Sequence, residues 1–286
     1  MRIGVFDSGY GGLTILEQIR QYLPMYDYLY LGDNARAPYG SHSFEVIHQY
    51  TWQAVQYLFR ADCSLIILAC NTASAKALRT IQQQDLPAYR AMQSQGNRLP
   101  VSLLNVLGVI RPTAEVVALK TRNGHIGVLG TTGTVNSGSY GIELQKQRPD
   151  LHIAQQACPL WVPLIENGEH IHQGADYFVE KYLRLLFQQD PDIDTLVLGC
   201  THYPLLLPKI QSFLPHITAH TVEVVAQGEI VARSLKDYLR RHTDLADTLS
   251  QNATCTYLTT EQAEKFAESA SLFLHTPIAA QHVALL

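Results

Sequence analysis

The chain has 286 residues, of which 47% are hydrophobic and 16% are charged, and its formal net charge at pH 7 is −4. This composition is that of a folded globular protein and excludes a disordered chain, while the weak acidity excludes the broad basic surface of a nucleic-acid-binding protein. No apolar run reaches the roughly 18 residues of a membrane helix, and the apolar start of the chain is too short for a signal peptide. We therefore expect a cytoplasmic protein with neither a membrane nor a nucleic acid as partner.

The first part of the chain alternates short apolar runs with amphipathic patterns. Such runs predict buried strands, and the apolar residues at helical spacing that follow them predict helices. Strands and helices alternate at residues 2–6, 11–23, 28–33, 43–61, 64–70 and 74–84. Three strand-then-helix units in succession indicate a parallel sheet with helices on both faces.

The segment 85–100 contains two prolines, a glycine and many polar residues, so we expect an extended loop that leads into the second half. The alternation then resumes, although the helices between the strands are fewer. Strands are predicted at 125–134 (with a Gly/Thr turn at its end), 152–159, 195–200 and 217–225, and helices at 137–147 and 175–189.

The predicted fold is an α/β fold of two pseudo-symmetric parallel-sheet halves with the active site between them. The last 75 or so residues supply further strand and helix segments that could pack back on the first half. We therefore predict a first domain made of residues 1–99 plus 209–286 and a second domain made of residues 100–208.

Two of the five cysteines, Cys70 and Cys200, end apolar runs of the same kind, "LIILACNT" and "LVLGCTH". In each half an earlier strand carries a glycine: Gly4 lies 66 residues before Cys70, and Gly127 lies 73 residues before Cys200. This similar spacing favours an internal duplication. Ligands of parallel α/β sheets bind outside the carboxyl ends of the strands, where a helix start stabilises a thiolate. Two thiols on opposite sides of a ligand suit racemisation or epimerisation, because one removes a proton from one face while the other delivers a proton to the opposite face.

A purely structural role is the alternative for these two cysteines, and it is the role expected for Cys63, Cys158 and Cys255. The polar residues that directly follow Cys70 and Cys200 favour chemistry over packing. No C-x-x-C pair is present, which argues against a zinc site or a thioredoxin-type site, and in the cytoplasm all five cysteines are expected to be reduced.

The stretch "FDSGYGG" at 6–12 places a carboxylate, a hydroxyl and three glycines after the first strand. Glycines let backbone amides approach an anion closely, so the stretch could hold one. It has no lysine of a phosphate-binding loop, and its G-x-G-G spacing lacks the third glycine of a dinucleotide fingerprint. The alternative is a tight turn in which Asp7 or Ser8 caps the next helix.

Six motifs follow one another along the chain: "FDSGYGGL" at 6–13, "DNARAPYG" at 33–40, "ACNTAS" at 69–74, "GTTGTVNSGSY" at 130–140, "CPLWVPLIENG" at 158–168 and "GCTHYP" at 199–204. In this order they resemble the motifs of glutamate racemases, the cofactor-independent amino-acid racemases of bacterial cell-wall synthesis. Together with residues 257–274, which resemble the C-terminal piece of that family, they extend the similarity over nearly the whole chain.

The resemblance implies that Cys70 and Cys200 are the two acid/base residues. Cys70 would take the α-proton of D-glutamate and Cys200 that of L-glutamate, which would supply D-glutamate for peptidoglycan. Asp7 would assist Cys70, and His202 and Glu166 would serve Cys200. The resemblance implies neither a cofactor nor a metal. No pyridoxal lysine motif is visible, so the site has to stabilise the carbanion with preorganised donors.

The resemblance also implies the contacts to the substrate, glutamate, and an assembly into a homodimer. Asp7 and His202 would touch the substrate, and the α-carboxylate and the amino group would be bound by Asn71, Thr72 and Thr201. The pocket for the side-chain carboxylate would be formed by Ser8, Tyr39, Gly40, Thr131 and Thr134.

The sequence departs from the family pattern at two places. The segment 85–100 is longer than usual, and "VEVVAQG" at 222–228 replaces a run that resembles Asp-Ser-Ala, so that Glu223 and Val224 stand where polar residues are expected.

Three other functions remain open from the residues alone. A racemase of aspartate or of another amino acid would share the motifs. A cysteine hydrolase would use Cys70 or Cys200 as nucleophile and His202 as base. A non-catalytic anion-binding module would need neither thiol.

Overall fold

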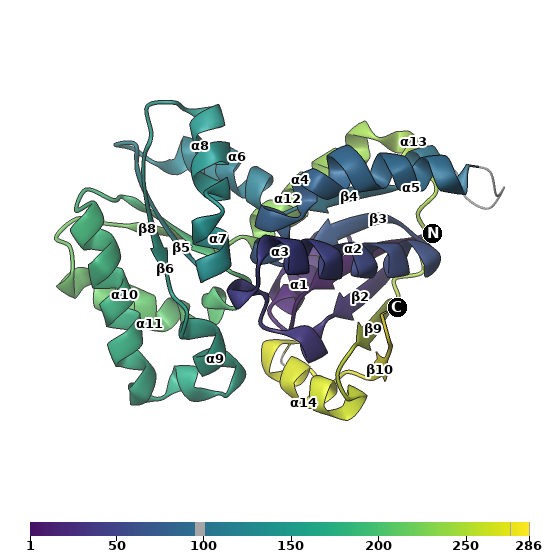
Figure 1. The fold of residues 1–286 in the computed structure, drawn as a ribbon. Helices are drawn as coiled ribbons and strands as arrows, with labels where there is room; N and C mark the ends of the chain where they lie inside the picture. The colour runs from purple at the N-terminus through teal and green to yellow at the C-terminus, as the bar shows by residue number, and fades with distance from the viewer. Residues whose placement is uncertain (95–100, 275, 286) are drawn as a thin grey trace.

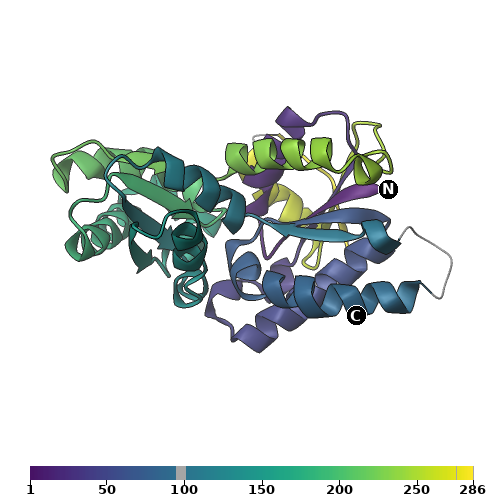
Figure 2. The same ribbon diagram turned by 90° about the horizontal axis from the view of Figure 1, so that it is seen from above.

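The computed structural model describes residues 1–94, 101–274 and 276–285, which form two lobes side by side (Figure 1). Each lobe is built on a parallel sheet, one with six strands in the order β10-β9-β2-β1-β3-β4 and one with four strands in the order β6-β5-β7-β8. Figure 2 shows α12 on one face of the larger sheet and α2 and α5 on the other. The predicted α/β fold with two parallel-sheet halves is confirmed.

The elements follow one another in regular strand and helix alternation. The strands of the larger sheet are β1 (Arg2–Asp7), β2 (Tyr28–Gly32), β3 (Cys63–Leu68), β4 (Asn105–Gly108), β9 (Cys255–Thr259) and β10 (Ala280–His282). Those of the smaller sheet are β5 (His125–Gly130), β6 (His152–Ala157), β7 (Thr195–Gly199) and β8 (Glu223–Val225). The order β2-β1-β3-β4 thus recurs as β6-β5-β7-β8, as a duplicated unit would require.

The helices pack on these sheets and connect their strands. They are α1 (Gly12–Tyr22), α2 (Phe44–Arg60), α3 (Asn71–Lys76), α4 (Leu78–Thr80), α5 (Leu86–Gln93), α6 (Ile110–Lys120), α7 (Thr132–Asn136), α8 (Ser139–Gln147), α9 (Trp161–Glu166), α10 (Asp176–Gln189), α11 (Leu207–Phe213), α12 (Gly228–Arg241), α13 (Thr243–Ala246) and α14 (Ala263–Leu274). None of the helices in the described ranges combines the length and the apolar character that crossing a bilayer would require.

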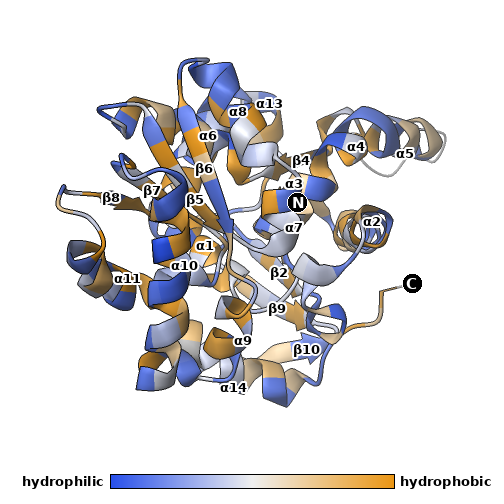
Figure 3. Ribbon diagram, turned by 60° about the vertical axis from the view of Figure 1, so that its left-hand side comes forward, coloured by the Kyte–Doolittle hydropathy of each residue, from blue (hydrophilic) through white to orange (hydrophobic). Residues whose placement is uncertain are grey.

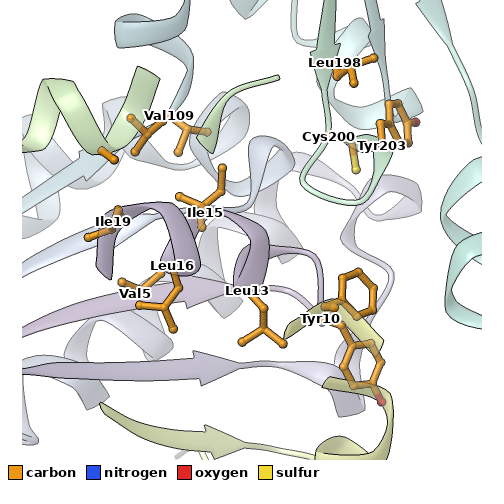
Figure 4. Close-up of a cluster of buried hydrophobic side chains, with 14 of the residues drawn as sticks. Val5, Tyr10, Leu13, Ile15, Leu16, Ile19, Val109, Leu198, Cys200 and Tyr203 are labelled. Carbon is orange, nitrogen blue, oxygen red and sulfur yellow. The ribbon is translucent and has the colours of Figure 1, made fainter. Parts of the chain in front are cut away.

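The apolar residues of the strands form the core of both lobes (Figure 3). All six residues of β3 are buried, as a parallel strand covered on both faces requires. The helices add apolar faces, and Leu13, Leu16 and Ile19 of α1 are buried at helical spacing. One cluster of buried side chains runs from α1 into the second lobe, where it includes Leu198 and Tyr203 (Figure 4). The lobes are therefore joined by a hydrophobic contact in addition to the two segments of chain that pass from one sheet to the other.

The prediction of an extended loop at 85–100 is wrong for its first part, because α5 occupies Leu86–Gln93. Pro87 lies in the first turn of this helix, directly after the π-helical turn of Ile81–Asp85, and the chain stays helical through it. Tyr89 packs against the ring of Phe59 at a centroid distance of 5.5 Å and fixes α5 on α2. Residues 95–100 lie outside the described part of the chain.

The strand predicted at 217–225 is confined to Glu223–Val225. Its partner β7 begins at Thr195, which is opposite Glu223, so residues before Glu223 have no strand to pair with. The backbone carbonyl of Thr221 instead accepts a hydrogen bond from Arg122.

The chain crosses between the sheets after β4 and after β8. The predicted domain boundaries at 99/100 and 208/209 are therefore displaced from the crossings, because β4 pairs with β3 of the first sheet and β8 pairs with β7 of the second. The strands β9 and β10 return to the first sheet, where β9 pairs with β2.

Asp27 holds the returning C-terminal segment against the first sheet. Its carboxylate accepts four hydrogen bonds of 2.6–3.2 Å from the backbone and side chains of Asn252 and Thr254. Burial alone would raise the pKa of Asp27, but these hydrogen bonds outweigh it and lower that pKa. The contribution to stability is therefore present above the ordinary pKa of about 3.9 and is lost as the pH falls through the lowered value.

We expect an Asp27→Asn variant to lose about 1.5–3 kcal/mol of unfolding free energy at pH 7, because hydrogen bonds to a charged acceptor are replaced by clashes between donors. Urea unfolding at pH 7 and near pH 3 measures the loss, which should shrink at the lower pH. The control is Asp244→Asn, since Asp244 is exposed. Equal stability of both variants would show that the segment is held by its apolar contacts alone.

Candidate active site

The carboxyl ends of the central strands of both sheets bring the predicted residues together between the lobes. Asp7 is the last residue of β1, Cys70 follows β3, and Cys200 directly follows β7. Figure 4 shows Cys200 at the end of β7, in the lobe opposite the one that carries Tyr10 and Leu13. All three predicted groups are buried, with exposed fractions of 0% for Asp7, 5% for Cys70 and 6% for Cys200.

Cys70 is the N-cap of α3. Its sulfur lies 3.4 Å from the amide nitrogen of Ala73 and 3.3 Å from the hydroxyl of Ser8. Burial raises the pKa of Cys70 to about 12, and the Asp7 carboxylate adds to this rise, whereas the contacts with Ser8 and Ala73 oppose it. The protonated thiol is therefore the form that this environment favours at neutral pH.

Cys200 faces a histidine that is itself held by a carboxylate. The Cys200 sulfur is 3.9 Å from His202 Nδ1, and His202 Nε2 is 3.0 Å from Glu166 Oε1. Burial alone lowers the pKa of His202, but the Cys200 and Glu166 side chains outweigh burial and raise this pKa to about 10. An imidazolium at this position places a positive charge beside the Cys200 sulfur. The two cysteines thus have different surroundings despite their similar strand ends.

Asp7 lies between the two lobes rather than only beside Cys70. It accepts hydrogen bonds from the amide of Gly9 at 2.9 Å and from the hydroxyl of Thr201 at 3.4 Å. Burial raises the pKa of Asp7, and the positive charge of His202 opposes that rise. A Cβ atom at Gly11 would overlap the side chains of Thr201 and His202, so the glycine allows the lobes to approach at this point.

Three predicted threonines converge on one spot. The Thr72 hydroxyl is 2.8 Å from that of Thr131 and 3.4 Å from that of Thr134. Gly40 packs on Thr131, since a Cβ atom at Gly40 would come within 3.0 Å of the Thr131 Cβ atom. Tyr39 is buried beside them, but its O–H donates to Asp33 at 2.5 Å and is therefore not free to donate to a carboxylate.

The Asn71 side chain, predicted to bind the substrate, is engaged inside the protein. Its amide donates to Gln227 Oε1 at 2.6 Å and accepts from the Tyr140 hydroxyl at 2.7 Å. A carboxamide has two N–H groups, so one of them remains for a ligand.

Sequence reasoning missed Gln227 and Phe273. Gln227 belongs to the segment "VEVVAQG", which departs from the family pattern, but the sequence directs attention to Glu223 and Val224 of that segment. These two residues lie on β8. The only local signal for Gln227 is its position, because it is a single carboxamide side chain between Ala226 and Gly228 at the start of α12. Phe273 of α14 packs edge-on against the ring of His202, with a centroid distance of 5.6 Å.

Among the residues that the structure describes, His125, Asp190 and Asp192 place metal-ligand atoms within 4.8 Å of one another. His125 begins β5, so this group is at the opposite end of the strand from Thr131. Its geometry is accounted for by the hydrogen bond of 2.8 Å between His125 Nδ1 and Asp190 Oδ2.

Comparisons with known proteins agree with this geometry. The model of the family described as Asp/Glu/hydantoin racemase matches residues 12–235. A glutamate racemase of Persephonella marina is 41% identical over 218 residues, which are 76% of each chain.

Solved structures extend the similarity to the whole fold. The glutamate racemase isoform RacE1 of Bacillus anthracis matches with a TM-score of 0.84 and 32% identity over 99% of this chain and 97% of that one. A glutamate racemase of Francisella tularensis, solved in complex with D-glutamate, matches with a TM-score of 0.81 and 30% identity over the same shares of the two chains. Because the family match spans most of the residues and the solved structures cover nearly all of them, this chain belongs to the Asp/Glu/hydantoin racemase family.

Proposed function

We propose that this protein interconverts L- and D-glutamate without a cofactor, and that Cys70 and Cys200 exchange the α-proton on opposite faces of the substrate. The observation that carries the proposal is the pairing of two buried thiols at equivalent strand ends, one in each lobe. The product D-glutamate would serve peptidoglycan synthesis. The homodimer implied by the family resemblance remains a prediction.

The proposed proton transfer follows from the unequal surroundings of the thiols. Cys200, next to the His202 imidazolium, acts as the base toward L-glutamate, and Cys70 with its raised pKa delivers a proton to the other face. The reverse reaction exchanges these roles. Desolvation favours the transfer, because a buried thiolate loses the water that would otherwise solvate it.

The substrate contacts are proposed on the same basis. The free N–H of Asn71 and the hydroxyls of Thr72 and Thr201 would bind the α-carboxylate and the amino group. The hydroxyls of Thr131 and Thr134, which lie beside that of Thr72, would turn from one another toward the side-chain carboxylate. Ser8 and Asp7 close the site at the end of β1. Tyr39 and Gly40 shape the pocket through packing.

One observation supports a cysteine hydrolase as the second candidate. Cys200, His202 and Glu166 line up as nucleophile, base and orienting carboxylate. The separation of 3.9 Å between sulfur and nitrogen exceeds the usual 2.6–3.2 Å or so of an activated pair, and this candidate leaves Cys70 without a task.

The deciding experiment incubates the purified protein with L- or D-glutamate in D2O, with EDTA and without pyridoxal phosphate. We expect the optical signal of either enantiomer to decay to zero while NMR shows loss of the α-proton. Turnover of aspartate but not glutamate would keep the chemistry and change the substrate. Absence of exchange with both amino acids would refute the racemase and favour the hydrolase.

A further inference from the structure

A closed network of buried side chains lies where the chain crosses between the lobes. It joins Asn71, the first residue of α3, to Thr113 of α6, Tyr140 of α8 and Gln227, which directly precedes α12. The exposed fractions are 2% for Asn71 and Gln227 and 0% for Thr113 and Tyr140. The network therefore contains groups from both lobes and from a crossing segment, without access to water.

The hydrogen bond that Thr113 donates determines which atom is the donor in every other hydrogen bond of the network. The Thr113 hydroxyl donates to the Val109 carbonyl at 2.7 Å, so its oxygen can only accept from Gln227 Nε2, at 2.9 Å. This sets the orientation of the Gln227 amide, whose nitrogen also donates to the Tyr140 hydroxyl at 2.7 Å. The oxygen of Gln227 is then left to accept from Asn71, and the Asn71 oxygen accepts from Tyr140.

Gln227 is the member that the others depend on. It contacts Asn71, Thr113 and Tyr140, and its amide uses both N–H groups and its oxygen. Because these side chains are buried, a group that loses its hydrogen bond to Gln227 cannot form one to water instead.

The network ends one residue away from Cys70. Asn71 directly follows Cys70, whose sulfur caps the first turn of the same helix. The orientation of this turn sets where the sulfur points. Because Tyr140 and Thr113 belong to the lobe that carries Cys200, the network relates the position of one thiol to the other lobe.

We propose that Gln227 is a positioning residue, whose carboxamide joins Asn71 to Thr113 and Tyr140 across the lobes and thereby fixes Cys70 relative to Cys200. This rests on the proposed two-thiol reaction, in which the α-carbon has to lie within reach of both sulfurs. A displacement of about 1 Å can cost a factor of roughly 10² in rate, so the expected signature is a loss of turnover with the substrate still bound.

The test compares Gln227→Met, which keeps the size of the side chain but removes its hydrogen bonds, with Thr113→Val. The matched control is Thr51→Val, because Thr51 is also fully buried in a helix and its hydroxyl donates to the carbonyl four residues earlier, of Ile47, at the same 2.7 Å. Thr51 has no contact with the network. We expect kcat to fall by about 10- to 100-fold in both network variants, and by more than KM rises through the loosened Asn71 amide, together with a larger primary isotope effect from 2-deuterated glutamate. Thr51→Val should lower only the unfolding temperature.

A second readout is independent of turnover. Peptide-resolved alkylation by iodoacetamide measures the reactivity of Cys70 and Cys200 separately, and Gln227→Met should change the rate at Cys70 by about tenfold while the rate at Cys200 stays the same. If both thiols keep their rates and the network variants lose stability alone, as Thr51→Val does, Gln227 is a structural residue and the inference is overturned. An inactive wild type with altered Cys70 reactivity in Gln227→Met would instead refute the racemase and retain the positioning role.

Discussion

In D2O, a Cys70→Ser variant is expected to exchange the α-proton of L-glutamate but not that of D-glutamate, and a Cys200→Ser variant is expected to do the opposite. The remaining thiol still reaches its own face of the α-carbon. Since a thiol carries a single proton, the proton that it removes either returns to the same face or is first replaced by deuterium from the solvent. Exchange then occurs without inversion, and NMR on each enantiomer measures it.

The same variants should lose racemisation by about 10²–10⁴-fold, the usual contribution of a positioned acid or base. Rates of racemisation cannot by themselves assign the thiols. Enantiomers have equal free energies, so the equilibrium constant is unity and kcat/KM has to fall equally in both directions for any variant. Only the exchange of one enantiomer at a time distinguishes the two faces.

Cys63→Ser is the control, because Cys63 is a buried cysteine at the other end of the strand that leads to Cys70. It should racemise both enantiomers. If each single variant exchanged both enantiomers, one thiol would serve both faces and the two-base mechanism would be wrong. If the specificities were reversed, the mechanism would stand and the assignment of Cys70 to D-glutamate would be exchanged with that of Cys200.

The sequence allowed the fold and the position of the thiols to be predicted because both depend on local patterns. Unbroken apolar runs such as residues 65–69 indicate buried parallel strands, and a polar residue directly after such a run has to lie at the carboxyl edge of the sheet. The prediction of a loop at 85–100 was wrong at Pro87, because a proline is compatible both with the first turn of a helix and with a loop.

The contacts between lobes could not be predicted, since they depend on partners far apart in the chain. Asn71 and Gln227 are separated by 156 positions, and neither residue type indicates burial. The hydrogen bond between Asp7 and Thr201 spans 194 positions. The Asp7 carboxylate was expected to assist Cys70 of its own lobe, but it also has this partner in the other lobe. Distant pairs of this kind leave no periodicity in a single sequence.

Replacement of His202 by Asn is expected to lower kcat/KM by about 10²–10³-fold near pH 8, and Glu166→Gln should lower the pH at which activity is lost on the alkaline side. In the wild type, Cys200 and Glu166 raise the pKa of His202 to about 10, so the imidazolium persists through the neutral and mildly alkaline range. Without the Glu166 charge this pKa falls, and the imidazolium beside the Cys200 sulfur is lost at a lower pH. The pH profile of kcat/KM for both enantiomers measures the shift.

Glu169→Gln is the matched control, because Glu169 is exposed and lies three residues further along the same segment. Its alkaline limb should coincide with that of the wild type. Stability provides an independent check whose sign is fixed by the raised pKa of His202: the pairing with Glu166 stabilises the folded protein fully below the ordinary pKa of about 6.5 and loses this effect as the pH rises through about 10. The difference in unfolding free energy between wild type and Glu166→Gln should therefore shrink over that interval. A constant difference, with an unmoved alkaline limb, would mean that Glu166 orients the imidazole without holding its proton.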